Sequence, residues 1–285
     1  METVTTIAAA RDRLDRARAD GATVGLVPTM GYLHEGHASL IERAAAEHPF
    51  VAVTVFVNPL QFGPTEDLDA YPRDLAADQQ LIERCGGTLV IAPSVEEMYP
   101  RPILTTVTVA EVSARLEGAS RPTHFAGVAT VVAKLFNLAG PCHAYFGEKD
   151  WQQVAVIRRM AQDLNFPVTV VACPIVREPD GLARSSRNVY LTEPERAAAP
   201  VLHRALEAGI AAIERGERDP AAIHRLMADL VGAEPHAALD YAEVVDAATL
   251  TPVDPLAGEL RLLVAARFGR ARLIDNVGVE VASGS

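Results

Sequence analysis

Short apolar segments of strand length recur along the first 175 residues, and segments long enough for helices lie between them. The apolar segments cover residues 23–27, 50–57, 88–91, 143–146 and 168–172. The segments of helical length cover residues 36–47, 73–85, 128–139 and 150–165. Because apolarity in the short segments is continuous rather than alternating, we expect strands buried on both faces of a parallel sheet. Such βαβ units bind ligands beyond the carboxyl ends of their strands.

The pattern changes after about residue 175. Two alanine-rich segments of helical character, 193–215 and 220–231, precede several strand-like segments without βαβ alternation. The strand-like segments 260–267 and 270–275 flank Phe268-Gly269, which is a connection short enough for a hairpin. We therefore predict an α/β domain over residues 1–175 and a smaller C-terminal α+β domain over residues 176–285.

Charge and composition disfavour several classes of protein. The formal net charge is -11, and an acidic surface repels the phosphate backbone of nucleic acids. The first twenty residues lack the apolar core of a signal peptide, and no apolar run is long enough to span a membrane. Cys85, Cys142 and Cys173 are too widely spaced to suggest a disulfide framework or a zinc site. We expect a cytoplasmic protein that binds neither nucleic acid nor membrane.

The segment 28–40 follows the first predicted strand, runs into a predicted helix and contains His34-Glu35-Gly36-His37. A glycine at a strand-to-helix junction lets the backbone approach a phosphate, and the amino terminus of the helix offers N–H groups and a favourable dipole. The two histidines would add side-chain donors. Taken alone, a pair of histidines three residues apart is equally compatible with a metal pair or with helix capping.

A second polar segment, Arg184-Ser185-Ser186-Arg187-Asn188, lies in a predicted loop after residues 176–181. Hydroxyl and guanidinium groups beside a glycine suit an anionic oligophosphate. A solvated surface loop is the more frequent explanation of such a segment in isolation. In combination with His34 and His37, phosphate binding is favoured.

These two segments resemble the HIGH and KMSKS-type signatures of the nucleotidyl-transferring superfamily. Three blocks narrow the resemblance to the pantothenate synthetase (pantoate–β-alanine ligase) family, namely residues 28–31, 146–150 and 185–188. Additional matches occur at residues 55–62, 69–74 and 121–128, so the likeness extends over essentially the whole chain. It implies an α/β fold with a Rossmann-like parallel sheet flanked by helices, in which the first domain binds nucleotide and substrate.

The resemblance implies ATP-dependent condensation of (R)-pantoate with β-alanine in the biosynthesis of pantothenate, a coenzyme A precursor. Pantoate would attack the α-phosphorus of ATP and expel pyrophosphate, and the amine of β-alanine would then displace AMP from pantoyl-adenylate. Attack of one anion on another accumulates charge, so preorganised donors should be the main catalytic device. The catalytic candidates are His34, His37, Lys149, Ser185, Ser186 and Arg187.

The family's ATP-binding positions map onto three parts of the chain. They are Met30, Gly31, Tyr32, Leu33, His34, Glu35, Gly36 and His37, then Gly147, Glu148, Lys149 and Asp150, and finally Val176, Arg184, Ser185, Ser186 and Arg187. Asp150 is expected to cap a helix while Lys149 points toward ligand. Arg184 departs from the methionine that the family usually carries, and it could assist triphosphate binding or point away from it.

Gln61 and Gln153 match the positions that hold pantoate, and Gln61 is also close to the β-alanine position. Asn58, Tyr71 and Arg121 are weaker candidates for the same pocket, for which generic surface roles are equally compatible. Mg²⁺ should arrive with ATP and be held mainly by phosphate oxygens, so we expect no tightly bound, protein-ligated metal. The other histidines form no cluster with ligand spacing and are assigned to surface or packing roles; they are His48, His124, His143, His203, His224 and His236.

Three other functions are weighed against this hypothesis. A nucleotidylyltransferase needs the same histidine chemistry, but its phosphorylated acceptor calls for more cations than Gln61 and Gln153 provide. An aminoacyl-tRNA synthetase is disfavoured because the chain is short and acidic. A non-catalytic ATP sensor would not need both histidines, the lysine and the serine pair. The resemblance further implies a homodimer, and we hypothesise that the C-terminal domain acts as a lid that excludes water from the adenylate.

Overall fold

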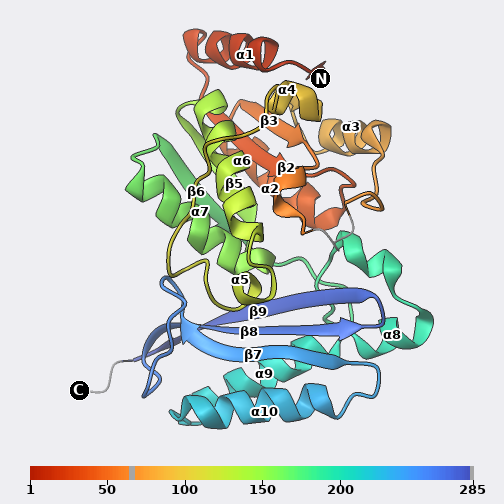
Figure 1. The fold of residues 1–285 in the computed structure, drawn as a ribbon, viewed down its shortest axis with the longest axis vertical. Helices are drawn as coiled ribbons and strands as arrows, with labels where there is room; N and C mark the ends of the chain where they lie inside the picture. The colour runs from red at the N-terminus through yellow and green to blue at the C-terminus, as the bar shows by residue number, and fades with distance from the viewer. Residues whose placement is uncertain (64–67, 283–285) are drawn as a thin grey trace. The chain divides into compact units, whose positions relative to one another are not determined.

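The structure is a computed structural model that describes residues 1–63 and 68–282 of the chain. The chain divides into two compact units. The first comprises Met1–Gly147 and Val156–Pro174, and the second comprises Glu148–Ala155 and Ile175–Ser285, the last three of whose residues lie outside the described part. Figure 1 shows the elements of each unit.

The first unit is built on a six-stranded sheet in which every pair of neighbouring strands is parallel. The strands are β1 (Glu2–Val4), β2 (Val24–Thr29), β3 (Phe50–Val55), β4 (Leu89–Ile91), β5 (Cys142–Gly147) and β6 (Val168–Cys173). Their spatial order is β1-β4-β3-β2-β5-β6. From β4 to β6 this is the doubly wound order, which reverses direction between β2 and β5. The predicted Rossmann-like parallel sheet is confirmed.

Helices of the first unit cover this sheet. They are α1 (Ile7–Ala19), α2 (Glu35–Glu47), η1 (Pro59–Gln61), α3 (Leu75–Arg84), α4 (Val95–Met98), α5 (Glu117–Ser120), α6 (His124–Ala139) and α7 (Trp151–Asp163), whose first five residues belong to the second unit. Ile41 of α2 and Ile82 of α3 are fully buried in one cluster with Val27, Val53 and Val90 of the sheet. Helices α1 and α6 pack against each other and against β2. These contacts explain the continuous apolarity of the central strands.

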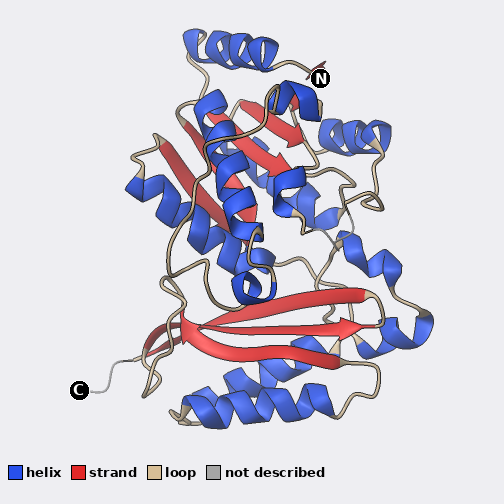
Figure 2. Ribbon diagram, viewed as in Figure 1, coloured by secondary structure: helices blue, strands red, loops and turns tan. Residues whose placement is uncertain are grey.

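The second unit contains a three-stranded antiparallel sheet with two long helices packed against it (Figure 2). The strands are β7 (Ala238–Asp246), β8 (Gly258–Phe268) and β9 (Ala271–Val281), and the helical elements are η2 (Glu148–Asp150), η3 (Ser186–Tyr190), α8 (Glu193–Ala198), α9 (Val201–Glu214) and α10 (Pro220–Gly232). Strands β8 and β9 pair up to Phe268 and Ala271, which leaves a two-residue connection. Gly269 adopts a positive φ of 54° there, a conformation that favours glycine.

Two differences from the sequence predictions have local causes. The predicted helical segment 193–215 divides into α8 and α9, with Pro200 at the division, because proline lacks the N–H that continues a helix. Strand β1 and helix α1 were not predicted. The buried face of α1 consists of Ala10, Leu14 and Ala17, so its apolar stripe is weak.

Two further findings bear on the classes of protein considered from the sequence. In the part of the chain that the structure describes, none of the helices combines the length and the apolarity that crossing a membrane requires. Cys85, Cys142 and Cys173 are buried thiols without disulfide partners. Burial raises the pKa of the Cys142 thiol to about 12.

Candidate functional site

The turn from β2 into α2 is held by side chains from neighbouring elements of the first unit. Thr29 at the end of β2 donates its hydroxyl to the carbonyl of Thr54 (2.6 Å), and the same oxygen accepts the N–H of Gly31 (3.2 Å). The backbone N–H groups of Tyr32 and Leu33 donate to the carboxylate of Asp78 at 2.9 and 2.7 Å. Gly31 and Tyr32 both have positive φ angles, 83° and 52°. The strand-to-helix junction predicted from the sequence is therefore a tight, supported turn.

His34 and His37 form a reciprocal cap at the start of α2. His34 is the N-cap residue, and its Nδ1 accepts the backbone N–H of Gly36 at 3.1 Å. The Nδ1 of His37 accepts the backbone N–H of His34 at 3.3 Å, and the two ring centroids lie 4.2 Å apart. A neutral imidazole that accepts a hydrogen bond at Nδ1 carries its proton on Nε2. The tautomer assigned by these contacts gives both rings an Nε2–H donor.

The side chain of Gln61, predicted to hold pantoate, lies next to the segment that carries the histidines. Its Nε2 contacts the sulfur of Met30 at 2.9 Å, and its Oε1 accepts from Asn58 Nδ2 at 3.2 Å. Asn58 also donates to the carbonyl of Gly127 (3.1 Å) and accepts from the hydroxyl of Tyr99 (2.8 Å). Both amide side chains belong to buried residues. The structure thus brings Met30, Asn58 and Gln61 together in one polar cluster.

Helix α6 begins beside this cluster. The carbonyl of Gln61 lies 2.9 Å from Nδ1 of His124 and accepts from the guanidinium of Arg121 at 3.3 Å. At Gly127, a Cβ atom would lie only 2.2 Å from the carbonyl oxygen of Leu60, so the close approach of α6 to η1 requires glycine. Arg121 therefore lies next to Gln61. The fifth candidate for this pocket, Tyr71, is buried, and its ring contacts Phe62 edge-on with centroids 5.8 Å apart.

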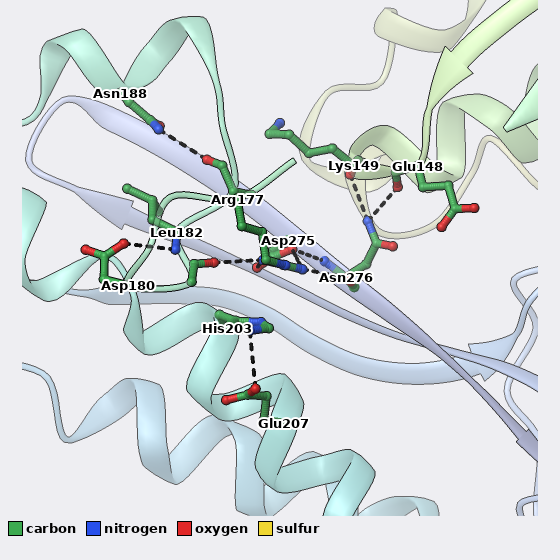
Figure 3. A network of polar contacts seen from close by, with 12 residues as sticks. Glu148, Lys149, Arg177, Asp180, Leu182, Asn188, His203, Glu207, Asp275 and Asn276 are labelled. Atoms are coloured by element: carbon green, nitrogen blue, oxygen red, sulfur yellow. Dashed lines mark hydrogen bonds and ion pairs between the residues drawn. The ribbon is translucent and has the colours of Figure 1, made fainter. Parts of the chain in front are cut away.

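In the second unit, Lys149 lies in η2, the short helical turn that follows β5 in the chain. The side-chain amide of Asn276, on β9, donates to the carbonyls of Glu148 (2.9 Å) and Lys149 (2.8 Å), as Figure 3 shows. Arg261 of β8 donates to Asn276 Oδ1 at 2.6 Å and to the carboxylate of Glu148 at 2.9 Å. These contacts fix the backbone of η2 against the antiparallel sheet. The Lys149 ammonium lies 3.7 Å from the carboxylate of Asp150, which directly precedes α7.

The loop before Ser185 is anchored to the same strand. Arg177 donates both terminal nitrogens to the buried carboxylate of Asp275, at 2.6 and 2.9 Å, and also bonds the carbonyl of Gly181 (Figure 3). The loop folds back on itself, since Arg184 N–H donates to the carbonyl of Val176 at 2.9 Å and Gly181 has a φ of 92°. Adjacent residues of β9, Asp275 and Asn276, thus hold the Arg177 loop and the Lys149 turn.

The serine-rich segment starts the helical turn η3. Ser185 is its N-cap residue, and the hydroxyl accepts the backbone N–H of Arg187 at 3.3 Å. Arg184 forms an ion pair with Glu178 across the folded loop, with an N–O distance of 2.9 Å. Of the two orientations considered for Arg184, the structure shows the guanidinium paired with a carboxylate of its own loop.

A pocket in the second unit is lined by residues from both of these segments. Its walls include Lys149, Ser185, Asn188, His203 and Asp275. In the described part of the chain, Oδ1 of Asn188 and Nδ1 of His203 are buried without a hydrogen-bond partner. Buried polar atoms are normally satisfied, so these two atoms mark a place for water or for a polar ligand.

Several residues that position the predicted groups were not identified from the sequence. They are Asp78, Arg177, Asp275 and Asn276. Asp78 lies 46 positions from Tyr32, and Asn276 lies 128 positions from Glu148, which they contact. No motif within one segment of the sequence could therefore identify them. Among the remaining predicted positions, Gly147 ends β5, Gln153 is the third residue of α7, and Val176 is half-buried.

Two of the remaining histidines, assigned from the sequence to surface or packing roles, lie next to each other in the structure. His48 Nε2 and His143 Nδ1 are 3.0 Å apart, with Glu47 beside them. The two residues are 95 positions apart in the sequence and meet because α2 and β5 both pack on β2. Spacing along the chain therefore could not reveal this cluster.

Comparison with known proteins places these features in a family. The family model described as pantoate-beta-alanine ligase matches residues 2–278. The chain is 51% identical over 281 residues to the pantothenate synthetase of Moorella thermoacetica. The aligned region covers 99% of each of the two chains. It is 52% identical over 275 residues to that of Geobacillus kaustophilus, covering 96% of this chain and 92% of the relative.

Solved structures agree with the sequence comparison. The pantothenate synthetase of Thermus thermophilus superposes with a TM-score of 0.93 at 52% identity, covering 99% of this chain and 100% of that one. The pantoate-beta-alanine ligase of Francisella tularensis, solved with beta-gamma ATP and beta-alanine, gives a TM-score of 0.79 at 31% identity, with 97% of each chain covered. The chain belongs to the pantoate–β-alanine ligase family of enzymes.

Proposed function

We propose that this enzyme condenses (R)-pantoate with β-alanine through a pantoyl-adenylate intermediate, with ATP as the activating substrate. The observation that carries the proposal is the histidine pair at the amino end of α2. Both Nδ1 atoms accept backbone N–H groups, which directs the proton of each neutral ring to Nε2. Two neutral donors at a helix amino terminus, beside the reversal point of a doubly wound sheet, suit a polyphosphate.

In the first step, a carboxylate oxygen of pantoate attacks the α-phosphorus of ATP. The new oxygen–phosphorus bond forms as the bond to the β-phosphate oxygen breaks, and pyrophosphate leaves with that electron pair. Negative charge grows on the phosphate oxygens in the transition state. We assign its stabilisation to Nε2–H of His34 and His37 and to Lys149, Ser185, Ser186 and Arg187. Mg²⁺ enters as part of the nucleotide substrate and is held mainly by phosphate oxygens.

In the second step, the amine of β-alanine attacks the acyl carbon of pantoyl-adenylate. The carbon–nitrogen bond forms, the bond between the acyl carbon and the phosphate oxygen breaks, AMP departs with that electron pair, and the amine proton passes to water. We assign pantoate binding to Gln61 and Gln153, because amide groups offer donors and an acceptor without adding charge. The complex of the Francisella tularensis relative with beta-gamma ATP and beta-alanine supports these two ligands for this chain.

Residues next to Gln61 are proposed to shape the same pocket. Asn58 bonds Gln61 directly, and Arg121 donates to the Gln61 carbonyl. Arg121 also brings a positive charge to the neighbourhood of a carboxylate substrate. Tyr71, whose ring packs on Phe62, is assigned a supporting role. We further propose that the enzyme works in the cytoplasm as a homodimer.

Pyrophosphate release tests the proposal. We expect release from ATP only when pantoate is present, and pantothenate detectable by mass spectrometry once β-alanine is added. Release that requires a phosphorylated acceptor would instead indicate a nucleotidylyltransferase. ATP binding without turnover under any of these conditions would indicate a sensor.

A further inference from the structure

The cluster of Glu47, His48 and His143 lies at the amino edge of the parallel sheet. Glu47 and His48 end α2, directly before β3 begins at Phe50, and His143 is the second residue of β5. His34 and His37 stand at the opposite, carboxyl edge, where β2 ends and α2 begins. The cluster is therefore separate from the machinery assigned to ATP.

The two imidazoles meet through one ring nitrogen each, at hydrogen-bonding distance. Nε2 of His48 lies 3.0 Å from Nδ1 of His143. The other nitrogen of His48 lies 3.0 Å from the hydroxyl of Thr23, which orients the ring as an outer-shell partner orients a metal ligand. Gly25 makes room for this ring, because a Cβ atom there would lie 3.1 Å from His48 Cδ2. The His48 ring is thus held in place from two sides.

Glu47 supplies a carboxylate on the same side. One ligand atom from each of the three residues lies within 4.8 Å of the other two. Tyr145 donates its hydroxyl to Glu47 Oε2 at 2.5 Å, and Arg43 pairs with Oε1. These contacts lower the pKa of Glu47, with the Tyr145 hydrogen bond as the largest cause. The Glu47 side chain is 33% exposed, so its carboxylate can shift toward the histidines while Tyr145 still holds one oxygen.

The electrostatic setting suits a cation. The carboxyl end of α2, where these side chains lie, carries the negative end of the helix dipole. Burial, and then the neighbouring His143, lower the pKa of His48, a direction that favours the neutral ring.

We propose that Nε2 of His48, Nδ1 of His143 and the carboxylate of Glu47 bind a divalent transition-metal ion, with Zn²⁺ as the best fit and water as the fourth ligand. Zinc–nitrogen bonds of about 2.0–2.1 Å at tetrahedral angles place two nitrogens about 3.3 Å apart, so the rings would separate slightly and turn until both lone pairs face the ion. Such an ion would join the end of α2 to β5, a structural role away from the reaction.

Zinc binding to the full-length enzyme, stripped with EDTA, tests the proposal. We would titrate Zn²⁺ by isothermal calorimetry and follow Co²⁺ by its visible absorption, which reports tetrahedral coordination. We expect one site per chain whose affinity falls at least about tenfold in His143→Gln and His48→Gln. His236→Gln, an exposed histidine outside the cluster, should bind like the wild type.

Further variants separate this site from the His34–His37 pair and guard against misfolding. Zn²⁺ binding that survives His143→Gln but is lost in His37→Gln would overturn the proposal, as would no binding above the level of a histidine-free control protein. Because His48 is buried, Tyr145→Phe offers a milder test, in which loss of the outer-shell hydrogen bond should weaken binding about 10- to 100-fold. If Tyr145→Phe and His143→Gln both fold and both bind Zn²⁺ as tightly as the wild type, the proposal is also overturned.

Discussion

Replacement of Arg177 by methionine should destabilise the second unit and impair catalysis together. The Asp275 carboxylate is 3% exposed, and Arg177 satisfies it with two bonds of 2.6 and 2.9 Å. Removing the guanidinium leaves a buried charge that retains the backbone N–H of Asn276 as a donor but has lost its countercharge. Breaking a buried pair by removing one partner costs about 3–5 kcal/mol. Arg177→Lys keeps the charge but loses the two-pronged geometry, so its cost should be smaller.

Urea unfolding followed by circular dichroism measures this cost. The matched control is Arg225→Met, because Arg225 pairs with Asp219 at the surface of the same unit, where the two side chains are 65% and 52% exposed. That change should alter the free energy of unfolding by less than about 1 kcal/mol. If Arg177→Met and Arg225→Met lower the free energy of unfolding by the same amount, the ion pair between Arg177 and Asp275 contributes no more than an exposed pair, and the reasoning fails.

The same variant reports on catalysis. Arg177 anchors the loop that leads to Ser185, and displacement of catalytic groups by about 1 Å can cost about 100-fold in rate. We expect pantoate-dependent pyrophosphate release to fall by about that factor in Arg177→Met, measured at a temperature where the variant is folded. A folded variant with wild-type kcat/KM would show that the anchor does not position the loop.

Three more predictions follow from single contacts. His37→Glu keeps an acceptor for the helix cap but has no N–H donor, so adenylation should slow by at least about 100- to 1000-fold with little change in stability, whereas His236→Glu should leave the rate unchanged. Gly127→Ala should lower the free energy of unfolding by about 1–3 kcal/mol and raise KM for pantoate, because the added Cβ would meet the Leu60 carbonyl. The control Gly232→Ala, which has open space around the added Cβ, should change neither quantity. Burial raises the pKa of the Asp78 carboxyl above 3.8, although two backbone N–H groups donate to it. The free energy of unfolding of the wild type, relative to that of Asp78→Asn, should therefore be greatest below pH 3.8 and fall as the pH rises through the folded-state pKa. A difference between the two unfolding free energies that does not change with pH would contradict this prediction.

The main sheet could be predicted because each of its strands from β2 to β6 lies in a self-contained apolar run. Val24–Thr29 and Phe50–Val55, for example, are buried almost throughout, so hydrophobicity alone marks them. Strand β1 was not predicted because only Val4 of its three residues is buried. Its place in the sheet depends on pairing with β4, which no local pattern reveals.

The candidate site was predictable where its residues are neighbours in sequence. His34 and His37, three residues apart, and the run from Ser185 to Arg187 each carry a recognisable local arrangement. The supports of these groups come from distant parts of the chain, such as Asp78 below the β2–α2 turn and Asn276 behind Lys149. Contacts of that kind are created by the tertiary fold, so a pattern of residues along one segment contains no signal for them.

The reciprocal cap of α2 has a consequence for how the enzyme responds to acid. Protonation of either Nδ1 would turn an acceptor into a donor that faces a backbone N–H, at His34 or at Gly36. The imidazole would then gain a charge and lose this hydrogen bond in the same event. The cap of α2 and the donor at Nε2 therefore depend on the same neutral rings, and a ring that takes up a second proton gives up its part in the cap.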